Sequence, residues 1–372
     1  MRNNNVVSDL KLRYSFGQAG NDQIGNTLFR ELYGASRIYG GVGGLNPIQL
    51  PNPDLKWETR EEHNVGLDLG LLKNRISLTV DAYRKVNKDL LIARSLYSTT
   101  GYSSIQQNLG SVENKGLELL LEAIPFNRAF RWKSTFNIAF QKNKVLKLYD
   151  DLPSLPGDAS IRVGEPLGSF FTSEWAGVNP ATGRGMWYDI NGNITYNPIN
   201  ADRKILGSIY PSHFGGWINT FSYKGFSLDA FFQYEYGRTR VDGQYQQMTR
   251  MGGATVNTLQ EAFDQRWTTP GQITGIPRPI NGLAEFNSVA FGTGSRYLFK
   301  TDYIRLKQFT IAYEIPGSTL KKYHFDGAKF YVQGVNLWTY SKWNSYDPEF
   351  TGDNFGIIPQ SRNITMGLQV KF

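Results

Sequence analysis

Apolar and polar residues alternate along ten stretches of the chain. Because successive side chains of a β-strand point to opposite faces, a period of two predicts strands with one apolar and one polar face. The ten stretches cover residues 10–16, 65–71, 76–82, 117–123, 132–140, 217–223, 226–234, 309–315, 330–334 and 364–372. Each is near the length that a tilted strand needs to cross a bilayer. A water-soluble sandwich shows the same alternation, so the pattern by itself leaves both architectures open.

The connections between the ten stretches are alternately short and long. Short connections occupy residues 72–75, 125–128, 222–225 and 316–326, and long ones residues 18–61, 94–111, 143–213, 237–296 and 338–361. Outer-membrane barrels have short periplasmic turns and long extracellular loops in this alternation, which soluble sandwiches rarely have. We therefore predict an all-β fold, an antiparallel transmembrane β-barrel segment of about ten strands. The first strand should run outward and the last inward.

Aromatic residues gather beside the short connections. They are Phe126, Phe130, Trp132, Tyr223, Phe226, Tyr323, Phe325 and Phe372. Amphipathic rings at the level of the lipid headgroups form such a girdle in membrane barrels. The alternative is that these are ordinary strand aromatics that pack in a core.

Composition supports an all-β chain and excludes several other classes. Aromatic residues make up 14% of the 372 residues, and 39 Gly and 16 Pro supply turn formers. The mean hydropathy is −0.40, and no run approaches the roughly 18 apolar residues of a membrane-spanning helix. The absence of Cys removes disulfides, thiol nucleophiles and thiolate metal sites. The net charge of +8 comes from scattered Lys and Arg, so nucleic acid is not an expected partner, whereas anionic lipid headgroups and acidic glycans remain open.

The N-terminal residues contain no apolar segment of a secretion signal. A barrel protein must be exported, so we expect residues 1–372 to be a portion of a longer protein.

Two groups of loop aromatics are candidate ligand contacts. Trp175, Trp187 and Tyr188 lie among turn-forming residues in the segment 170–196. Trp338, Tyr340, Trp343 and Tyr346 form a second group near Asp347 and Glu349, in which Trp338, Trp343 and Tyr346 are the candidate contacts. Aromatic faces stack on sugar rings or pack on peptide side chains, so both groups are candidate binding residues. The alternative is that the rings of the first group only hold their loop together, and that those of the second form the upper aromatic girdle and pack in their loop.

Catalytic and metal-binding signatures are absent from the sequence. Asp189–Asn193 superficially suggests a calcium loop, but Asn200 occupies the twelfth position, where a bidentate Glu is needed. No nucleophile elbow, Walker A motif or dinucleotide-binding glycine motif occurs. His63, His213 and His324 lie far apart in the sequence. We predict no catalytic residue, no metal and no cofactor.

Five sequence blocks resemble the SusC/RagA family of TonB-dependent transporters. They are NPDLKWET (52–59), DAYRKVNKDLL (81–91), STTGYSSIQQNLGSVENKGLEL (98–119), YIRLKQFTIAYEIP (303–316) and FYVQGVNLWTYSKWNSYDPE (330–349). The C-terminal ITMGLQVKF also resembles the last strand of the family. These blocks follow the family's order and span nearly the whole chain.

The resemblance implies that residues 1–372 are the C-terminal portion of a 22-stranded barrel in the cell outer membrane. The signal peptide, the N-terminal domain, the plug and the first strands would then lie outside this sequence. The resemblance also implies uptake of oligosaccharides or oligopeptides, a SusD-like surface lipoprotein as a partner, and energy from the TonB–ExbB–ExbD complex through the N-terminal part. The chain would contact outer-membrane lipids and the barrel assembly machinery.

The terminal strand resembles the signal that the insertion machinery recognises. Its alternating residues are Ile364, Met366, Leu368, Val370 and Phe372. The same residues are also compatible with an ordinary last strand.

Two functions from other classes remain open at this point. One is an outer-membrane enzyme of the protease or phospholipase type, which would bring His213 or His324 to a carboxylate and a hydroxyl. The other is a soluble carbohydrate-binding β-domain, in which the apolar rows would face each other across a dry interior.

Overall fold

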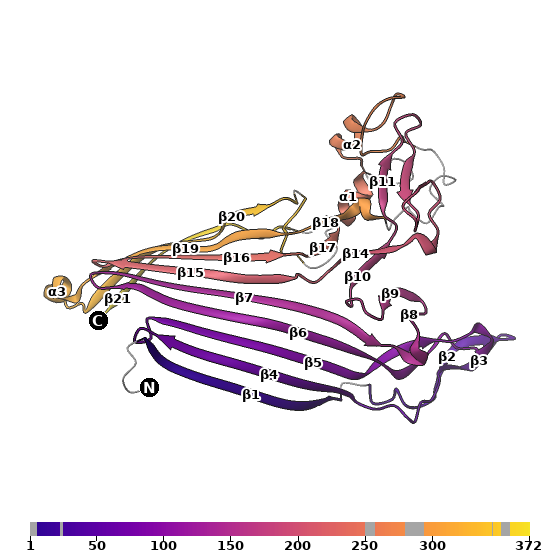
Figure 1. Ribbon diagram of the computed structural model, residues 1–372, viewed down its shortest axis with the longest axis horizontal. Coiled ribbons are helices and arrows are strands. Elements are labelled where there is room, and N and C mark those ends of the chain that lie inside the picture. Colours follow the sequence, from indigo (N-terminus) through magenta and orange to yellow (C-terminus); the bar gives the residue numbers. More distant parts are fainter. Residues whose placement is uncertain (1–5, 23–24, 250–256, 280–293, 344, 351–357) are drawn as a thin grey trace. The chain divides into compact units, whose positions relative to one another are not determined.

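The computed structural model describes residues 6–22, 25–249, 257–279, 294–343, 345–350 and 358–372. Its principal element is an antiparallel sheet of ten strands in the order β1-β4-β5-β6-β7-β15-β16-β19-β20-β21 (Figure 1). The strands are β1 (Val7–Asn21), β4 (Glu58–Leu71), β5 (Ile76–Ser95), β6 (Ser104–Asn127), β7 (Phe130–Lys147), β15 (His213–Tyr223), β16 (Phe226–Tyr236), β19 (Tyr303–Ile315), β20 (Gly327–Ser341) and β21 (Asn363–Lys371). Each of the ten predicted stretches overlaps one of these strands, which confirms the predicted all-β class.

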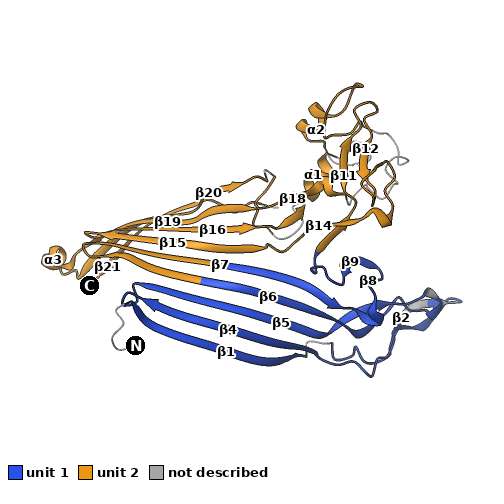
Figure 2. Cartoon of the chain, in the orientation of Figure 1, with its two compact units in different colours: residues 1–119, 139–168 blue, residues 120–138, 169–372 orange. Residues whose placement is uncertain are grey.

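The chain forms two compact units, and the boundary between them runs through β6 and β7 (Figure 2). Unit 1 consists of residues 1–119 and 139–168, and unit 2 of residues 120–138 and 169–372. Each unit therefore contains a part of the ten-stranded sheet together with some of the long connections.

The long connections carry small elements of their own. In unit 1 these are the hairpin β2 (Leu32–Tyr39) and β3 (Val42–Gln49), the pair β8 (Ser154–Leu155) and β9 (Asp158–Arg162), and the 3-10 turns η1 (Ser98–Thr100) and η2 (Tyr149–Asp151). In unit 2 they are β10 (Ser169–Thr172) with β14 (Lys204–Ser208), β11 (Trp175–Val178) with β12 (Gly185–Tyr188) and β13 (Ile194–Thr195), β17 (Thr239–Val241) with β18 (Leu298–Lys300), the helices α1 (Gly243–Met248) and α2 (Gln260–Gln265), and the turns η3 (Asn200–Asp202) and η4 (Ser295–Tyr297). The connection between β19 and β20 contains α3 (Gly317–Leu320) and η5 (Lys321–Tyr323).

The short connections are built from left-handed backbone. Lys224 and Gly225 join β15 to β16 with φ angles of 45° and 84°, as expected for a two-residue hairpin that matches the twist of its strands. A β-carbon at Gly225 would lie 2.7 Å from the carbonyl oxygen of Glu314 on β19. Glycine is therefore required there both by the backbone angle and by the neighbouring strand.

The long connection predicted over residues 94–111 was too long. In the structure β5 continues to Ser95 and β6 begins at Ser104, so only eight residues, 96–103, join them. The strands continue past the point where the apolar pattern stops. The prediction failed because it used the apolar pattern to mark the strand ends.

In unit 1, one face of the sheet is apolar over several consecutive rows. Leu12 of β1 pairs with Leu67 of β4, and Leu67 pairs with Val80 of β5. The next row repeats the pattern, since Leu69 of β4 pairs with Leu78 of β5. Because apolar residues alternate along each strand, apolar side chains lie beside one another across these three strands.

The opposite face of the same strands carries charges that pair with each other. The guanidinium of Arg13 on β1 lies 2.9 Å from Asp68 on β4 and 3.1 Å from Asp81 on β5. It crosses β4 above Gly66, where a β-carbon would come within 2.5 Å of the guanidinium carbon. Gly66 therefore keeps open the path along which one arginine links three strands.

In unit 2, aromatic rings form groups beside the short connections, which confirms the predicted clustering. Phe126 lies 6.2 Å from Trp132, and Trp132 lies 5.7 Å from Phe221 on β15. Beyond the next turn, Phe226 lies 4.4 Å from Tyr313. The rings contact each other across strands, and they remain exposed enough to reach the headgroup level of a membrane.

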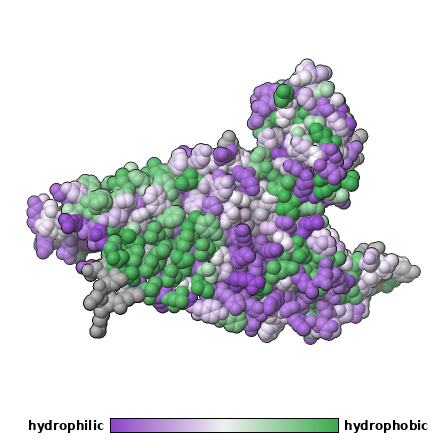
Figure 3. All heavy atoms as spheres, viewed as in Figure 1, coloured by the Kyte–Doolittle hydropathy of each residue, from purple (hydrophilic) through white to green (hydrophobic). Residues whose placement is uncertain are grey.

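The apolar faces of the strands are exposed, and buried apolar clusters are small. Leu12 is 75% exposed and Met366 is 69% exposed. The clusters found among the described residues are Val112, Val145, Leu148 and Leu155 in unit 1, and Ala262 and Ile276 in unit 2. Figure 3 shows apolar side chains gathered over the strand ends that carry the short connections. Apolar rows of this extent would be sealed by a second sheet in a sandwich, and they are open here.

Among the described residues, none of the helices combines the length and the hydropathy that crossing a membrane would require.

Candidate functional site

Two neighbouring cavities lie among the loop elements of unit 2. The first, of about 420 Å³, is lined by Trp175, Tyr245, Gln265, Gly275, Ile276, Ser295, Arg296 and Phe299. The second, of about 490 Å³, is lined by Asp242, Gln244, Tyr245, Met248, Leu259, Glu261, Phe299, Lys342, Trp343, Ser345 and Tyr346. Tyr245 of α1 and Phe299 of β18 border both, with ring centroids 5.6 Å apart and planes at 89°. Both volumes fall in the range of small-molecule sites.

The first cavity includes the tryptophan of the predicted loop segment. Trp175 on β11 is paired in register with Trp187 on β12, and their rings meet edge to face at 5.0 Å. The guanidinium of Arg296 lies 5.4 Å from the Trp175 ring. The Trp175 backbone N–H donates to the hydroxyl of Ser295 over 2.9 Å. Trp175 is thus held by β12 on one side and by η4 on the other.

Asp242 joins the two walls of the second cavity. One of its carboxylate oxygens accepts a hydrogen bond from the backbone N–H of Tyr245, which caps α1. The other accepts from the indole N–H of Trp343 over 3.2 Å. The Asp242 side chain is almost completely buried. A single carboxylate therefore fixes both the start of the helix and the orientation of the tryptophan opposite it.

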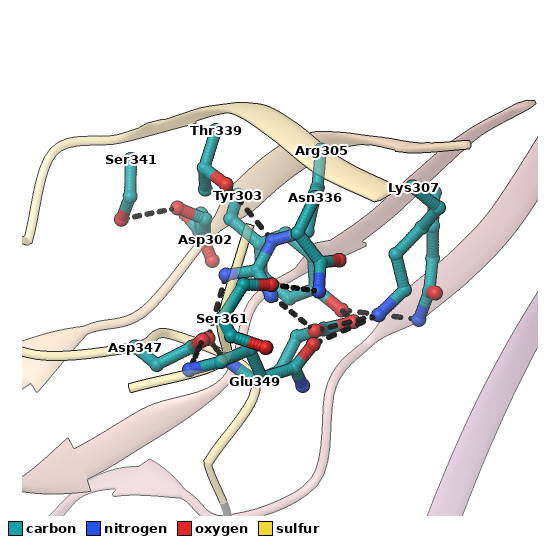
Figure 4. A network of polar contacts seen from close by, with 12 residues as sticks. Asp302, Tyr303, Arg305, Lys307, Asn336, Thr339, Ser341, Asp347, Glu349 and Ser361 are labelled. Atoms are coloured by element: carbon teal, nitrogen blue, oxygen red, sulfur yellow. Dashed lines mark hydrogen bonds and ion pairs between the residues drawn. The ribbon is translucent and has the colours of Figure 1, made fainter. Parts of the chain in front are cut away.

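A charged network fixes the segment that follows Trp343 (Figure 4). Arg305 on β19 is 3% exposed and lies 2.6 Å from Asp347 and 2.5 Å from Glu349. Lys307 lies 2.8 Å from the same Glu349 oxygen, and the Tyr303 hydroxyl donates to its other oxygen. Two acidic residues of the β20–β21 connection are therefore clamped against three side chains of one strand.

A β-bulge ends the row of polar side chains on β19. Gln308 pairs with Phe231 and Leu306 with Phe232, so Lys307 has no partner of its own on β16. An extra residue of this kind bends the strand and changes which face the following side chains occupy. Arg305 and Lys307 therefore share the polar face. Ile311 is also an odd-numbered residue, but it lies beyond the bulge and is about half exposed among the apolar residues.

Arg305 also sets the ionisation of its partner. Burial would raise the pKa of the Asp347 carboxyl, but the hydrogen bond from Arg305 and those from the backbone N–H groups of Glu349 and Gln360 hold it below its usual value. Removing one member of a buried, hydrogen-bonded ion pair typically costs about 3–5 kcal/mol, because the remaining charge stays desolvated. The network is therefore a strong local restraint on the β20–β21 connection.

The structure separates the six predicted aromatic residues. Trp343 and Tyr346 line the second cavity, and Trp175 lines the first. Trp187 supports Trp175, while Tyr188 continues β12 and pairs with Ile194. Trp338 pairs with Leu306 and is about half exposed, on the face opposite Arg305. It thus lies with the apolar outer residues, away from the two cavities.

The predicted terminal strand is β21, which pairs with β20. Met366 pairs with Val332 and Leu368 with Phe330, so its apolar residues continue the apolar face of the sheet. Ile364 and Val370 lie in the same row, and the Phe372 ring packs 5.3 Å from Phe325.

The histidines and the Asp189 turn occupy structural positions. Nδ1 of His63 lies 3.1 Å from the Tyr14 hydroxyl, the His213 ring stacks on Tyr236 at 4.9 Å, and His324 occupies a left-handed turn position. The Asp189 carboxylate accepts hydrogen bonds from the backbone N–H groups of Asn191 and Asn193, which hold its pKa below the usual value. These contacts give the enzyme hypothesis no support.

Sequence reasoning missed the residues that organise the site. Arg305, Asp242 and Phe299 were not singled out, since each looks like one more charged or aromatic residue of a strand or loop. The spacing YIRLKQF was a usable signal, because the apolar alternation changes phase between Leu306 and Phe309 and thereby marks the bulge.

Comparisons with known proteins agree on one family. The sequence profile described as TonB-dependent receptor-like β-barrel matches residues 5–234. TonB-dependent receptor P3 of Formosa agariphila is 31% identical over 100% of this chain and 40% of its own length, and TonB-dependent receptor SusC of Bacteroides thetaiotaomicron is 25% identical over 99% of this chain and 38% of its own. The chain thus spans about two fifths of the length of these curated relatives.

Solved structures give the same answer for the fold. The structure of the RagAB peptide transporter superposes with a TM-score of 0.86 and 29% identity, covering 100% of this chain and 42% of that one. The RagAB peptide importer in its open-open state gives a TM-score of 0.87 with 28% identity, over 100% of this chain and 41% of that one.

Proposed function

The chain belongs to the TonB-dependent receptor family of outer-membrane β-barrel proteins, and from this membership we propose that it is the barrel part of a transporter that takes up oligosaccharides or oligopeptides. The family is one of transporters rather than enzymes. The observation that carries the proposal is the exposed apolar face of the sheet, backed by paired charges such as Arg13 with Asp68 on the other face. Lipid on one side and a wet lumen on the other require this arrangement.

The chain contributes the C-terminal portion of that barrel in this proposal. β1 and β21 stand at the two ends of the strand order, so each has one neighbour in the sheet. An unpaired strand edge is costly in lipid, where no water satisfies its backbone groups. Further strands of the same protein would pair with both edges, and the family resemblance implies a total of 22.

The proposed partners follow from the same assignment. A SusD-like surface lipoprotein would cover the end that carries the long connections, and TonB–ExbB–ExbD would supply energy through the part of the protein outside residues 1–372. The barrel assembly machinery would recognise β21 and its terminal Phe372. The structural relative RagAB is a peptide transporter, which supports an oligopeptide as one of the two ligand classes.

Growth of the native bacterium tests the proposal. A strain that lacks the gene for the whole protein should lose growth on a limiting oligosaccharide or oligopeptide mixture, and the intact gene should restore it. The same defect should appear when TonB is inactivated. Growth on monosaccharides and free amino acids is the control and should be unchanged. Normal growth of the deletion strain on every oligosaccharide and oligopeptide mixture tried would contradict uptake as the function.

A further inference from the structure

We propose that the second cavity of unit 2 is a binding subsite that receives one apolar side chain of an oligopeptide. The inference rests on the proposed uptake function and adds to it a ligand class and a location. Neither the family match nor the names of the relatives assign a role to this cavity.

The cavity lining is mixed: it has an apolar part that suits a nonpolar side chain, and polar groups on Asp242, Gln244, Tyr245, Glu261, Lys342, Ser345 and Tyr346. Met248, Leu259, Phe299 and Trp343 contribute aliphatic or aromatic surface, and the side chain of Trp343 has its only hydrogen-bonding group already engaged by Asp242. Against this apolar part a pyranose would present hydroxyls, and each one that is buried there without a partner is costly. A leucine or phenylalanine side chain has no hydroxyl whose hydrogen bonds to water would be lost. Removing its apolar surface from water makes binding more favourable.

The rim of the cavity carries one charge of each sign. Lys342 follows directly after β20, and Glu261 lies in the first turn of α2; both are exposed. A short peptide has an ammonium group at one end and a carboxylate at the other. Opposite charges beside the cavity therefore complement a zwitterionic chain, whereas an uncharged oligosaccharide would gain hydrogen bonds but no ion pair from them.

Hydrogen bonds and ion pairs restrain several of the lining residues. Asp242 ties α1 to Trp343, and the backbone N–H of Leu259 donates to the carbonyl oxygen of Met248 over 3.0 Å. On the far side, Tyr346 precedes Asp347, which Arg305 holds in the charged network. A pocket whose walls are already ordered loses less entropy on binding, so it can select among side chains.

Binding to the purified, intact transporter in detergent tests the proposal. The probes are pentaglycine with a central Leu, pentaglycine with a central Ser, and cellohexaose as an uncharged oligosaccharide. The Leu peptide should bind at least about tenfold more tightly than the Ser peptide, since burial of an aliphatic side chain changes a binding constant by that order. Cellohexaose should not compete with it.

Two pairs of variants locate the effect. Met248→Trp narrows the apolar part of the cavity and should abolish the preference for Leu over Ser, while Phe263→Trp places the same ring on the exposed side of α2 and should keep it. Lys342→Glu, at an exposed position that does not endanger folding, should weaken the Leu peptide several-fold. Lys322→Glu in the β19–β20 connection is its control and should leave binding unchanged.

The outcomes separate this inference from the proposed function. Equal binding of the two peptides, or a Leu preference that survives Met248→Trp, would overturn the subsite. Binding of cellohexaose that Met248→Trp abolishes would overturn the ligand class. In either case nutrient uptake by cells that express the unaltered protein would remain intact, whereas failure of the proposed function would show as normal growth of the deletion strain.

Discussion

Val80→Arg tests whether the apolar face of unit 1 meets lipid. Val80 lies four residues from Ile76 at the short connection and four from Arg84, where the same face becomes polar. These eight residues span about 27 Å along the strand, or about 21 Å across a bilayer at a strand tilt of about 40°. An apolar band of a barrel is about 25 Å tall, so Val80 lies close to its middle.

The position in the band sets the expected magnitude. An arginine at the bilayer midplane costs a transmembrane barrel about 2–4 kcal/mol, which lowers the folding equilibrium constant about 30- to 700-fold. Val80→Leu keeps the apolar character and should change stability by less than about 1.5 kcal/mol. Ser77→Arg places the same charge on the opposite face, beside Gly70 on β4, and should stay within about 0.5 kcal/mol of the unaltered protein.

The assay is urea unfolding of the intact outer-membrane protein in lipid bilayers, with the denaturant midpoint and slope measured for all three variants. The amount of folded protein in isolated outer membranes gives an independent measure in cells. If Val80→Arg unfolds at the same urea concentration as the unaltered protein, or if Ser77→Arg is destabilised equally, the assignment of this face to lipid is refuted.

Three further predictions concern topology and the charged network. The chain contains no Cys, so single cysteines can report the topology. Tyr97→Cys, at an 86% exposed position between β5 and β6, should react with a membrane-impermeant maleimide in intact cells. Lys73→Cys in the β4–β5 connection should react only after the outer membrane is permeabilised, and the reverse labelling would invert the topology. Arg305→Gln should lower the free energy that holds the β20–β21 connection in its ordered position by about 3–5 kcal/mol. Trypsin should then cleave faster at Lys342, and an unchanged cleavage rate would show that the clamp contributes little. Because the pKa of Asp347 is lowered from 3.8, the stabilisation it provides is complete above that value and is lost as the pH falls through the lowered pKa. The protection of Lys342 from tryptic cleavage should accordingly be equal at pH 8 and pH 5. A partial loss of that protection at pH 5 would contradict the ion-paired state.

The strands could be predicted from sequence because the period of two is a local property. Each apolar row needs only its own strand. The register that aligns Leu67 with Val80 follows from the short connection 72–75, whereas the register of Leu12 with Leu67 spans the long connection between β1 and β4 and is set by matching the apolar faces of the two strands. The strand ends were harder to predict. β5 continues for eleven residues beyond Arg84, but its outer face there carries Lys88, which is paired with Glu61 of β4. Charged side chains such as Lys88 interrupt the row that Val86 and Leu90 would otherwise continue, so the apolar pattern marks the strand end poorly.

The candidate site could be predicted only in part. The sequence identified Trp175, Trp343 and Tyr346 because they are aromatic residues in turn-rich segments, where a bulky ring needs a partner or a ligand. The partners themselves depend on chain segments far apart in sequence. Trp343 is ordered by Asp242, 101 residues earlier, and Arg305 by Asp347, 42 residues later. No local pattern encodes contacts that exist only after two long connections have folded back over the strands.

The position at which one face changes from apolar to charged places the membrane surface on unit 1. Arg84 on β5 lies 2.5 Å from Glu113 on β6, and Lys115 lies 3.3 Å from the same carboxylate. Further along β6, the alternate residue Leu117 is exposed, so within two or three residues the same row passes from ion pairs to aliphatic side chains. Glu113 is buried, but Arg84 and Lys115 are each more than half exposed. An ion pair with a solvent-exposed partner contributes about 1 kcal/mol in water, whereas each charge would cost about 2–4 kcal/mol at the centre of a bilayer. The cluster is therefore stable only outside the hydrocarbon. The remaining length of β5 and β6 must stand in water, where Val112, Val145 and Leu148 bury one another instead of meeting lipid.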